Sequence, residues 1–195
     1  IKLTEEQLGR TLPGPVAGLE SDPALSLYAT GEQVIKGRRV ALLTADGVNE
    51  ASVDAMRRAL AEQGVHTQVL APHMGFVSTE EGGMLKVDGT IGGTPSVLFD
   101  AVAVPEGKSL EALSQCGKTR HYLWQAYRHL KAIALPGQAS ALLLASGLPE
   151  NASDPGLVAG RDIDGTMQDF ISAMKQHRVW EREKASCSMP MGQPA

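Results

Sequence analysis

The 195-residue sequence predicts an α/β fold, an open and mostly parallel sheet with helices on both faces. Two observations lead to this fold class. Short uninterrupted apolar runs recur along the chain, and such runs are typical of strands that are buried on both faces. Longer segments with apolar residues at helical spacing lie between them, so strands and helices alternate as they do in parallel sheets.

The first strand–helix–strand unit covers residues 40–70. Val40–Thr44 is predicted to be a buried strand, and Asp46-Gly47 forms the turn that follows it. Glu50–Gln63 has apolar residues three and four positions apart, and Gly64 closes this predicted helix. Val65–Leu70 is the second strand, so the unit has the length of a right-handed parallel crossover.

The remaining elements continue the alternation. Glycine pairs within Phe76–Gly93 predict a short hairpin-like excursion. Further strands are expected at Phe99–Pro105, Ala132–Leu135 and Gly156–Gly160. Helices are predicted over Lys108–Leu113, His121–Leu130, Ser140–Leu148 and Asp164–His177, with Asp164 as the N-cap of the last one. Together the elements predict a flavodoxin-like arrangement.

The two ends of the chain lack the periodicity of the domain between them. Residues 1–37 are rich in proline and glycine, which predicts an extended arm or linker. Within it, Asp22–Leu27 carries leucines that are expected to dock on the domain surface. The predicted domain covers residues 38–182, and residues 183–195 are expected to form a mobile tail.

Composition and charge exclude several classes of protein. The net charge of -4 and the pI near 5.7 argue against nucleic acid as a partner, since phosphate binding needs clustered cations. No apolar run approaches the roughly 20 residues that span a bilayer, and Ile1–Arg10 does not resemble a signal peptide. Cys116 and Cys187 are too distant in sequence to indicate a disulfide framework. We therefore expect a cytoplasmic protein that binds neither nucleic acid nor membrane.

The most informative segment is Lys131–Leu143, which reads as a short buried strand, a sharp turn and a helix start. This is the layout of a nucleophile elbow, which displays a Ser or Cys at its turn. Here the turn position is assigned to Pro136, which has no nucleophilic atom and no backbone N–H. The scaffold of an enzyme is predicted, but without a catalytic residue.

The other reactive residue types lack a supporting motif. Cys116 is interpreted as an incidental, partly buried thiol, and Cys187 as a tail residue without a partner. His121 and His129 could share one helix face, but no further ligand pattern indicates a metal. Asp46, Glu50, Glu106 and Gln138 are expected near the crevice at the strand ends, where ligands of such sheets usually bind. A small ligand in that crevice is supported by fold analogy only.

Half of the eight aromatic residues are Tyr122, Trp124, Tyr127 and Trp180. The first three belong to one predicted helix. We interpret them mainly as helical core, and the alternative is an anchor for a protein partner, because Trp and Tyr are favoured at interfaces.

Several strings resemble the C-terminal domain of large-subunit catalases of the hydroperoxidase II type. The match extends over residues 38 to about 182, and Asp22–Leu27 resembles the linker that precedes this domain in those proteins. Ala126-Tyr-Arg-His-Leu-Lys131 is its most specific part. Weaker parts are Gly37–Val48, Val69–Pro72, Phe99–Gly107, Asp164-Gly165 and His177–Trp180.

The resemblance implies a domain related to the PfpI and class I glutamine amidotransferase superfamily. Active members carry a Cys at the elbow, an acidic residue after the first strand and often a His after the Cys. In this sequence these places correspond to Pro136, to the region Glu50–Ser52 and to Gly137. The resemblance therefore implies no catalytic residue, no cofactor-binding residue and no metal site in this chain.

The first functional hypothesis is a non-catalytic accessory domain that supports stability and tetramer assembly. The resemblance implies a parent oxidoreductase that dismutes hydrogen peroxide with haem during oxidative stress. Its catalase barrel would lie in the same chain, and it would assemble as a homotetramer. One alternative is a PfpI-like hydrolase or glyoxalase. Another is a holdase-type chaperone that uses an exposed apolar surface.

Overall fold

A computed structural model describes residues 33–149 and 154–183 of the chain. A six-stranded sheet runs through the described part in the order β5-β2-β1-β6-β7-β8, and every neighbouring pair is parallel. Its strands are β1 (Arg39–Leu43), β2 (His66–Ala71), β5 (Gly89–Thr90), β6 (Ala101–Ala103), β7 (Ala132–Leu135) and β8 (Leu157–Ala159). The expected open, parallel and flavodoxin-like sheet is confirmed.

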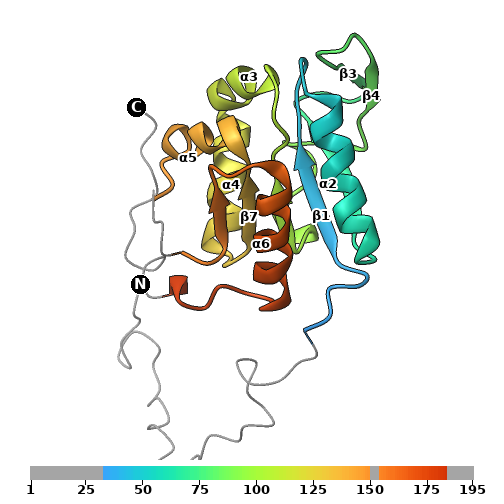
Figure 1. Cartoon of the computed structure of the whole chain (residues 1–195). Coiled ribbons are helices and arrows are strands. Elements are labelled where there is room, and N and C mark those ends of the chain that lie inside the picture. Colours follow the sequence, from blue (N-terminus) through green and yellow to red (C-terminus); the bar gives the residue numbers. More distant parts are fainter. Residues whose placement is uncertain (1–32, 150–153, 184–195) are drawn as a thin grey trace, which may run out of the picture. The chain divides into compact units, whose positions relative to one another are not determined.

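Helices cover both faces of this sheet (Figure 1). The helices α2 (Glu50–Glu62) and α6 (Ile163–Lys175) pack together on one face. The other face carries α3 (Ser109–Gln115), α4 (Gly117–Arg128) and α5 (Ala141–Ala145). Two hydrophobic clusters result, one on each side of the sheet.

The central strands are apolar throughout because both of their faces are covered. In β1, Val40 and Leu42 belong to the cluster under α2 and α6, whereas Ala41 and Leu43 belong to the opposite cluster. All four side chains are fully buried. This explains why an uninterrupted apolar run, rather than an alternating one, marked the strand in the sequence.

The helix α2 follows from local signals that the sequence displays. Asn49 is its N-cap, and its side-chain oxygen accepts a hydrogen bond of 2.8 Å from the Ser52 N–H. Val53, Met56 and Leu60 form its buried face. Gly64, with a φ of 70°, turns the chain into β2.

Two helix starts differ from the prediction. The helix α4 begins at Gly117 rather than His121, and within its first turn only Thr119 is buried. Only Cys116 separates α3 from α4. The N-cap position of α6 is Asp162, and Asp164 lies in the first turn, where a carboxylate still favours the helix dipole.

The glycine-rich excursion contains more than the expected hairpin. The strands β3 (Phe76–Ser78) and β4 (Met84–Lys86) form that antiparallel hairpin. The two residues of β5 then extend the main sheet, where Asp88 N–H donates to Val69 and Ile91 N–H to Ala71. A two-residue strand has no periodicity, so the sequence could not indicate it.

The core begins before Arg38, inside the segment that was predicted to be an arm. Ile35 is only 3% exposed and joins the cluster under α2 and α6. The Gly37 N–H donates a 2.8 Å hydrogen bond to Gly64. Asp22–Leu27 and the tail beyond Glu183 lie outside the described residues. No helix within residues 33–149 and 154–183 is long and apolar enough to cross a membrane.

Candidate functional site

The turn between β7 and α5 has the backbone of an elbow, with its strained residue one position later than the sequence indicated. Pro136 is extended, with φ -63° and ψ 151°. Gly137 has the left-handed φ of 46° and opens the short 3-10 helix Gly137–Ser140. Gly137 therefore replaces Pro136 as the residue at the point of the turn, and it has no side chain.

The space above Gly137 is filled by a carboxylate from the neighbouring strand end. A Cβ added to Gly137 would overlap with Oε1 of Glu106. The backbone fixes Glu106 there, since its N–H donates to Ser52 Oγ at 2.9 Å and its carbonyl accepts from the Asn49 N–H at 2.9 Å. A side chain at this turn would therefore require the Glu106 carboxylate to move.

The expected crevice residues bond to the β3–β4 hairpin instead of facing an open site. Asp46 accepts hydrogen bonds from the N–H (2.8 Å) and the hydroxyl (3.0 Å) of Ser78. Glu50 accepts a 3.3 Å bond from the Thr79 hydroxyl. Glu80, also on the hairpin, accepts from the Lys108 N–H at 3.0 Å and from the Asn49 amide at 3.3 Å.

The structure therefore brings Asp46, Glu50 and Glu106 to the same edge of the sheet, as predicted. Gln138 is exposed on the elbow helix. The hairpin lies against the place where an open α/β sheet usually receives its ligand. The arrangement holds loops together, and it presents no nucleophile paired with a base.

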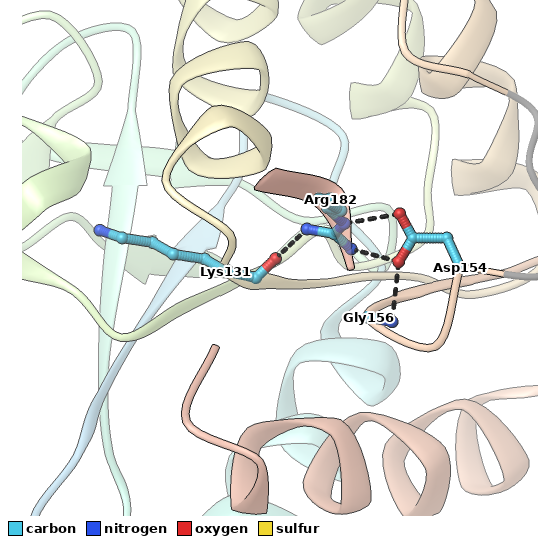
Figure 2. A network of polar contacts seen from close by, with 4 residues as sticks. All are labelled: Lys131, Asp154, Gly156 and Arg182. Atoms are coloured by element: carbon cyan, nitrogen blue, oxygen red, sulfur yellow. Dashed lines mark hydrogen bonds and ion pairs between the residues drawn. The ribbon is translucent and has the colours of Figure 1, made fainter. Parts of the chain in front are cut away.

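A second polar site lies at the opposite end of β7 and is buried (Figure 2). The Arg182 guanidinium forms two bonds with the Asp154 carboxylate, Nε to Oδ2 at 2.5 Å and Nη2 to Oδ1 at 2.8 Å. Its Nη1 donates to the Lys131 carbonyl at 2.6 Å, and its Cζ atom lies over the Tyr127 ring, 4.4 Å from the ring centre. Asp154 also accepts from the Gly156 N–H at 3.0 Å.

We call Asp154, Arg182 and the Lys131 carbonyl the clasp. Both charged side chains are 3% exposed, so this ion pair is desolvated and bidentate. The clasp joins the chain after α6 to the start of β8 and to β7. No local pattern indicates the clasp, because its two charged residues are 28 positions apart and neither belongs to a motif.

The Lys131 side chain extends away from the clasp, as Figure 2 shows. It is 2% exposed, and its ammonium donates to the carbonyls of Ser96 (2.5 Å) and Phe99 (2.7 Å). Burial, assisted by the charge of Arg178, lowers the pKa of Lys131 to about 8, although Asp100 acts in the opposite direction. In the sequence Lys131 stood out only as the first residue of the elbow segment and as part of the resemblance, and its burial was not expected.

Cys116 is partly buried between two helices, as the sequence suggested. Burial raises the pKa of its thiol. Hydrogen bonds from the side chain and backbone of Thr119, and the Lys118 backbone and charge, outweigh burial and lower the pKa overall. Cys187 lies outside the described residues.

The aromatic residues of α4 form core, as the main interpretation held. Tyr122 and Tyr127 are 4% and 2% exposed, and Trp124 packs against the same cluster. His121 and His129 line one groove beside α4. In the part of the chain that the structure covers, no three His, Cys, Asp or Glu residues are grouped so that they could hold a metal ion.

The fold has a known counterpart. A two-domain protein from Anabaena variabilis, with DJ-1/ThiJ/PfpI-like and ferritin-like domains, superposes with a TM-score of 0.65. The alignment covers 76% of this chain and 54% of that one, at 17% sequence identity. This likeness supports the α/β class with a DJ-1/PfpI-like sheet and carries no information about activity.

The sequence comparisons identify the family. Residues 36–184 match the C-terminal domain found in long catalases, and the chain belongs to that family. It is 40% identical over 177 residues to catalase HPII of Pseudomonas aeruginosa, covering 90% of this chain and 24% of the relative. Catalase-B of Dictyostelium discoideum is 32% identical over 174 residues, covering 88% and 25%. The chain thus spans about a quarter of the length of the curated relatives it matches.

Proposed function

We propose that this chain is a non-catalytic accessory domain of a long haem catalase, where it supports stability and tetramer assembly in the cytoplasm. The parent would dismute hydrogen peroxide in the oxidative stress response. The observation that carries the non-catalytic part is the elbow, where Gly137 replaces a nucleophile and Glu106 fills the space above it. The family match supports the catalase parent.

The described residues do not fit haem, which we assign to the catalase barrel of the parent chain. The haem iron of catalases takes a tyrosine ligand. Burial raises the pKa of Tyr122 and that of Tyr127, where Asp154 adds to the effect and Arg182 opposes it. Both side chains are packed in the core, at 4% and 2% exposure, which leaves no room for a haem macrocycle over either hydroxyl.

The β3–β4 hairpin offers a surface for packing against another domain. Its inner face is anchored by Val77, which is 1% exposed. Strand alternation turns Phe76 and Met84 outward, and they are 59% and 67% exposed. Met74, at 62% exposure, precedes them. We name Met74, Phe76 and Met84 the hairpin patch, and exposed apolar residues grouped in this way are typical of interaction sites.

The first test is performed on the 195-residue chain. We expect no Soret band after titration with haem and no oxygen release from hydrogen peroxide. Stoichiometric haem binding with peroxide turnover would contradict the accessory role. Glyoxal and peptide hydrolysis should stay at background, and Cys116→Ser should not change them; activity abolished by that substitution would favour the PfpI-like alternative.

The second test is performed on a parent catalase that carries this domain. Replacing Phe76 and Met84 by Ser should lower the temperature at which the tetramer dissociates by several degrees. The matched control is Leu144→Ser on α5, another exposed apolar residue (76%), which should have no effect. Equal effects of the two changes would overturn the assembly role of the hairpin patch.

The hairpin patch also favours the holdase alternative. If the isolated chain suppresses the thermal aggregation of an unrelated enzyme, and the Phe76 and Met84 double substitution abolishes this, then the patch binds unfolded chains. If the double substitution abolishes this suppression but leaves the parent tetramer intact, then holdase activity is the main function of the hairpin patch.

A further inference from the structure

A groove of about 550 Å³ lies between α4 and the short 3-10 helix Ser96–Leu98, on the sheet face opposite α2 and α6. Its volume falls within the range of small-molecule sites in proteins. The α4 residues that line it run from Gly117 to His129, a length of about 18 Å at 1.5 Å per helical residue. The groove therefore suits an elongated ligand. It is separate from the elbow, the clasp and the hairpin patch.

The walls of the groove combine an apolar base with hydrogen-bond donors. Ile91, Pro95, Val97 and the Tyr122 ring supply apolar surface. Val97 is 69% exposed, and its neighbour Leu98 is 48% exposed, so apolar surface continues to the rim. Such surface gains free energy when a ligand's alkyl chain covers it.

The polar lining of the groove favours an anion. Lys118 supplies a permanent positive charge, while His121, Gln125 and His129 supply donor groups, and no acidic residue is among the lining residues. The Lys118 side chain is exposed at this end of α4. The first turn of α4, a 12-residue helix, also lies at this end, and the helix dipole attracts negative charge there, while Cys116 accepts hydrogen bonds from the backbone of Lys118 and Thr119.

A buried donor without a partner lies one helical turn beyond Lys118. The Tyr122 hydroxyl is enclosed and makes no hydrogen bond, although Tyr122 is one of the groove's lining residues. Residues four positions apart share a face of a helix, so Lys118 and Tyr122 are neighbours on this wall. A buried hydroxyl without a partner destabilises the protein until a ligand atom satisfies it.

We propose that this groove binds an apolar carboxylate of the medium-chain fatty acid class. The carboxylate would lie at the α4 N-terminus, where it accepts hydrogen bonds from Lys118 and Tyr122, and the alkyl chain would lie along Val97 toward His129. The proposal concerns a binding function and is independent of the accessory role proposed above.

The experiment uses octanoate and its uncharged counterpart 1-octanol as probes. Each is titrated into the isotopically labelled 195-residue chain, and amide shifts are followed by NMR. We expect octanoate to shift the amides of Gly117, Gln125 and Val97, with an affinity at least fivefold higher than that of 1-octanol. Equal affinities, or no shifts around the groove up to the solubility limit, would overturn the proposal.

Variants separate the headgroup from the chain. Lys118→Gln should weaken octanoate at least fivefold and leave 1-octanol unchanged. Tyr122→Phe, which removes only the hydroxyl, should weaken octanoate severalfold without lowering the melting temperature. Val97→Asp should abolish octanoate binding, while the control Val34→Asp, at an exposed valine outside the groove, should not. Unchanged octanoate affinity in Lys118→Gln would contradict the assigned headgroup site.

Discussion

Arg182 and Lys131 are both buried cations, and the fold compensates their charges differently. Arg182 has a carboxylate, a carbonyl and an aromatic ring around its guanidinium. Lys131 has only two carbonyls in hydrogen-bond contact with its ammonium. A paired guanidinium stays charged, whereas an ammonium without a carboxylate in contact loses its proton more easily.

We expect Arg182→Met to lower the free energy of unfolding by about 3–5 kcal/mol, because it leaves the Asp154 carboxylate buried and unpaired. The double variant Arg182→Met with Asp154→Leu should recover part of that loss, since it removes both charges. Urea unfolding of the two single variants and the double variant measures the coupling. Additive losses would show that the clasp does not act as a pair.

Because the pKa of Lys131 is lowered, we expect the free energy of unfolding to increase in mildly alkaline solution. Its pKa is about 8 in the folded chain and 10.5 ordinarily, so between these values the unfolded chain binds one more proton. Stability therefore rises with pH in this window, by at most about 1.4 kcal/mol per pH unit. Urea unfolding from pH 8 to 9.5 should show a steeper rise for the wild type than for Lys131→Met. Parallel profiles would refute the lowered pKa.

Single residues were the hardest features to predict from the sequence. Asp154 and Arg182 are ordinary charged residues in loop-like segments, and only the tertiary structure brings them together. The absence of a nucleophile at the elbow could be predicted from Pro136-Gly137, because this prediction depends only on which residue types stand there. Glu106 was expected near the strand ends, but its position over Gly137 depends on how two neighbouring strands end.

At the scale of elements, the elbow combines a strained backbone with a filled space. We expect Gly137→Ala to destabilise the chain through its positive φ, about 1–3 kcal/mol, and through overlap with Glu106, about 1–3 kcal/mol more. Gly82→Ala is the matched control, because Gly82 has a φ of 85° and open space around its Cβ position.

Adding Glu106→Ala to Gly137→Ala should recover the stability that is lost through the overlap. The loss caused by the positive φ of residue 137 should remain. Thermal unfolding of the three variants measures both parts. If Gly137→Ala and Gly82→Ala had equal effects, the overlap with Glu106 would add nothing to the cost of the positive φ, and the Glu106 carboxylate would not resist a side chain at the elbow.

Elements with strong local signals were predicted well. The strand Ala132–Leu135 has the same bounds in the structure, and Glu50–Gln63 differs from α2 by one residue. Apolar runs and helix caps act over a few residues, so the sequence displays them. The start of α4 was missed because residues 117–120 contain one buried residue, Thr119, and therefore show no apolar periodicity.

For the whole molecule, Ile35 predicts where a truncation becomes harmful. A chain that begins at Gln33 keeps every described contact, so the described domain should keep its own stability. A chain that begins at Arg38 loses the buried Ile35 side chain, at about 1.5–3 kcal/mol, and the hydrogen bond from Gly37.

Differential scanning calorimetry of the two truncations should therefore differ by several degrees, at about 2–4 °C per kcal/mol for this size. The variant Ile35→Ala in the longer chain should reproduce most of the difference. Equal melting temperatures of the two truncations would show that Ile35 and Gly37 do not stabilise the domain.

The clasp also has a consequence for the order of events during synthesis. A ribosome releases Lys131 51 residues before Arg182. At 5–20 residues per second, this interval is about 3–10 s. For that time the Lys131 carbonyl has no guanidinium partner, and the Asp154 carboxylate lacks one over the last 28 residues. The strands β7 and β8 can pair in this interval, but the clasp cannot form. Folding of this domain is therefore complete only after Arg182, which lies close to the end of the described residues, has been synthesised.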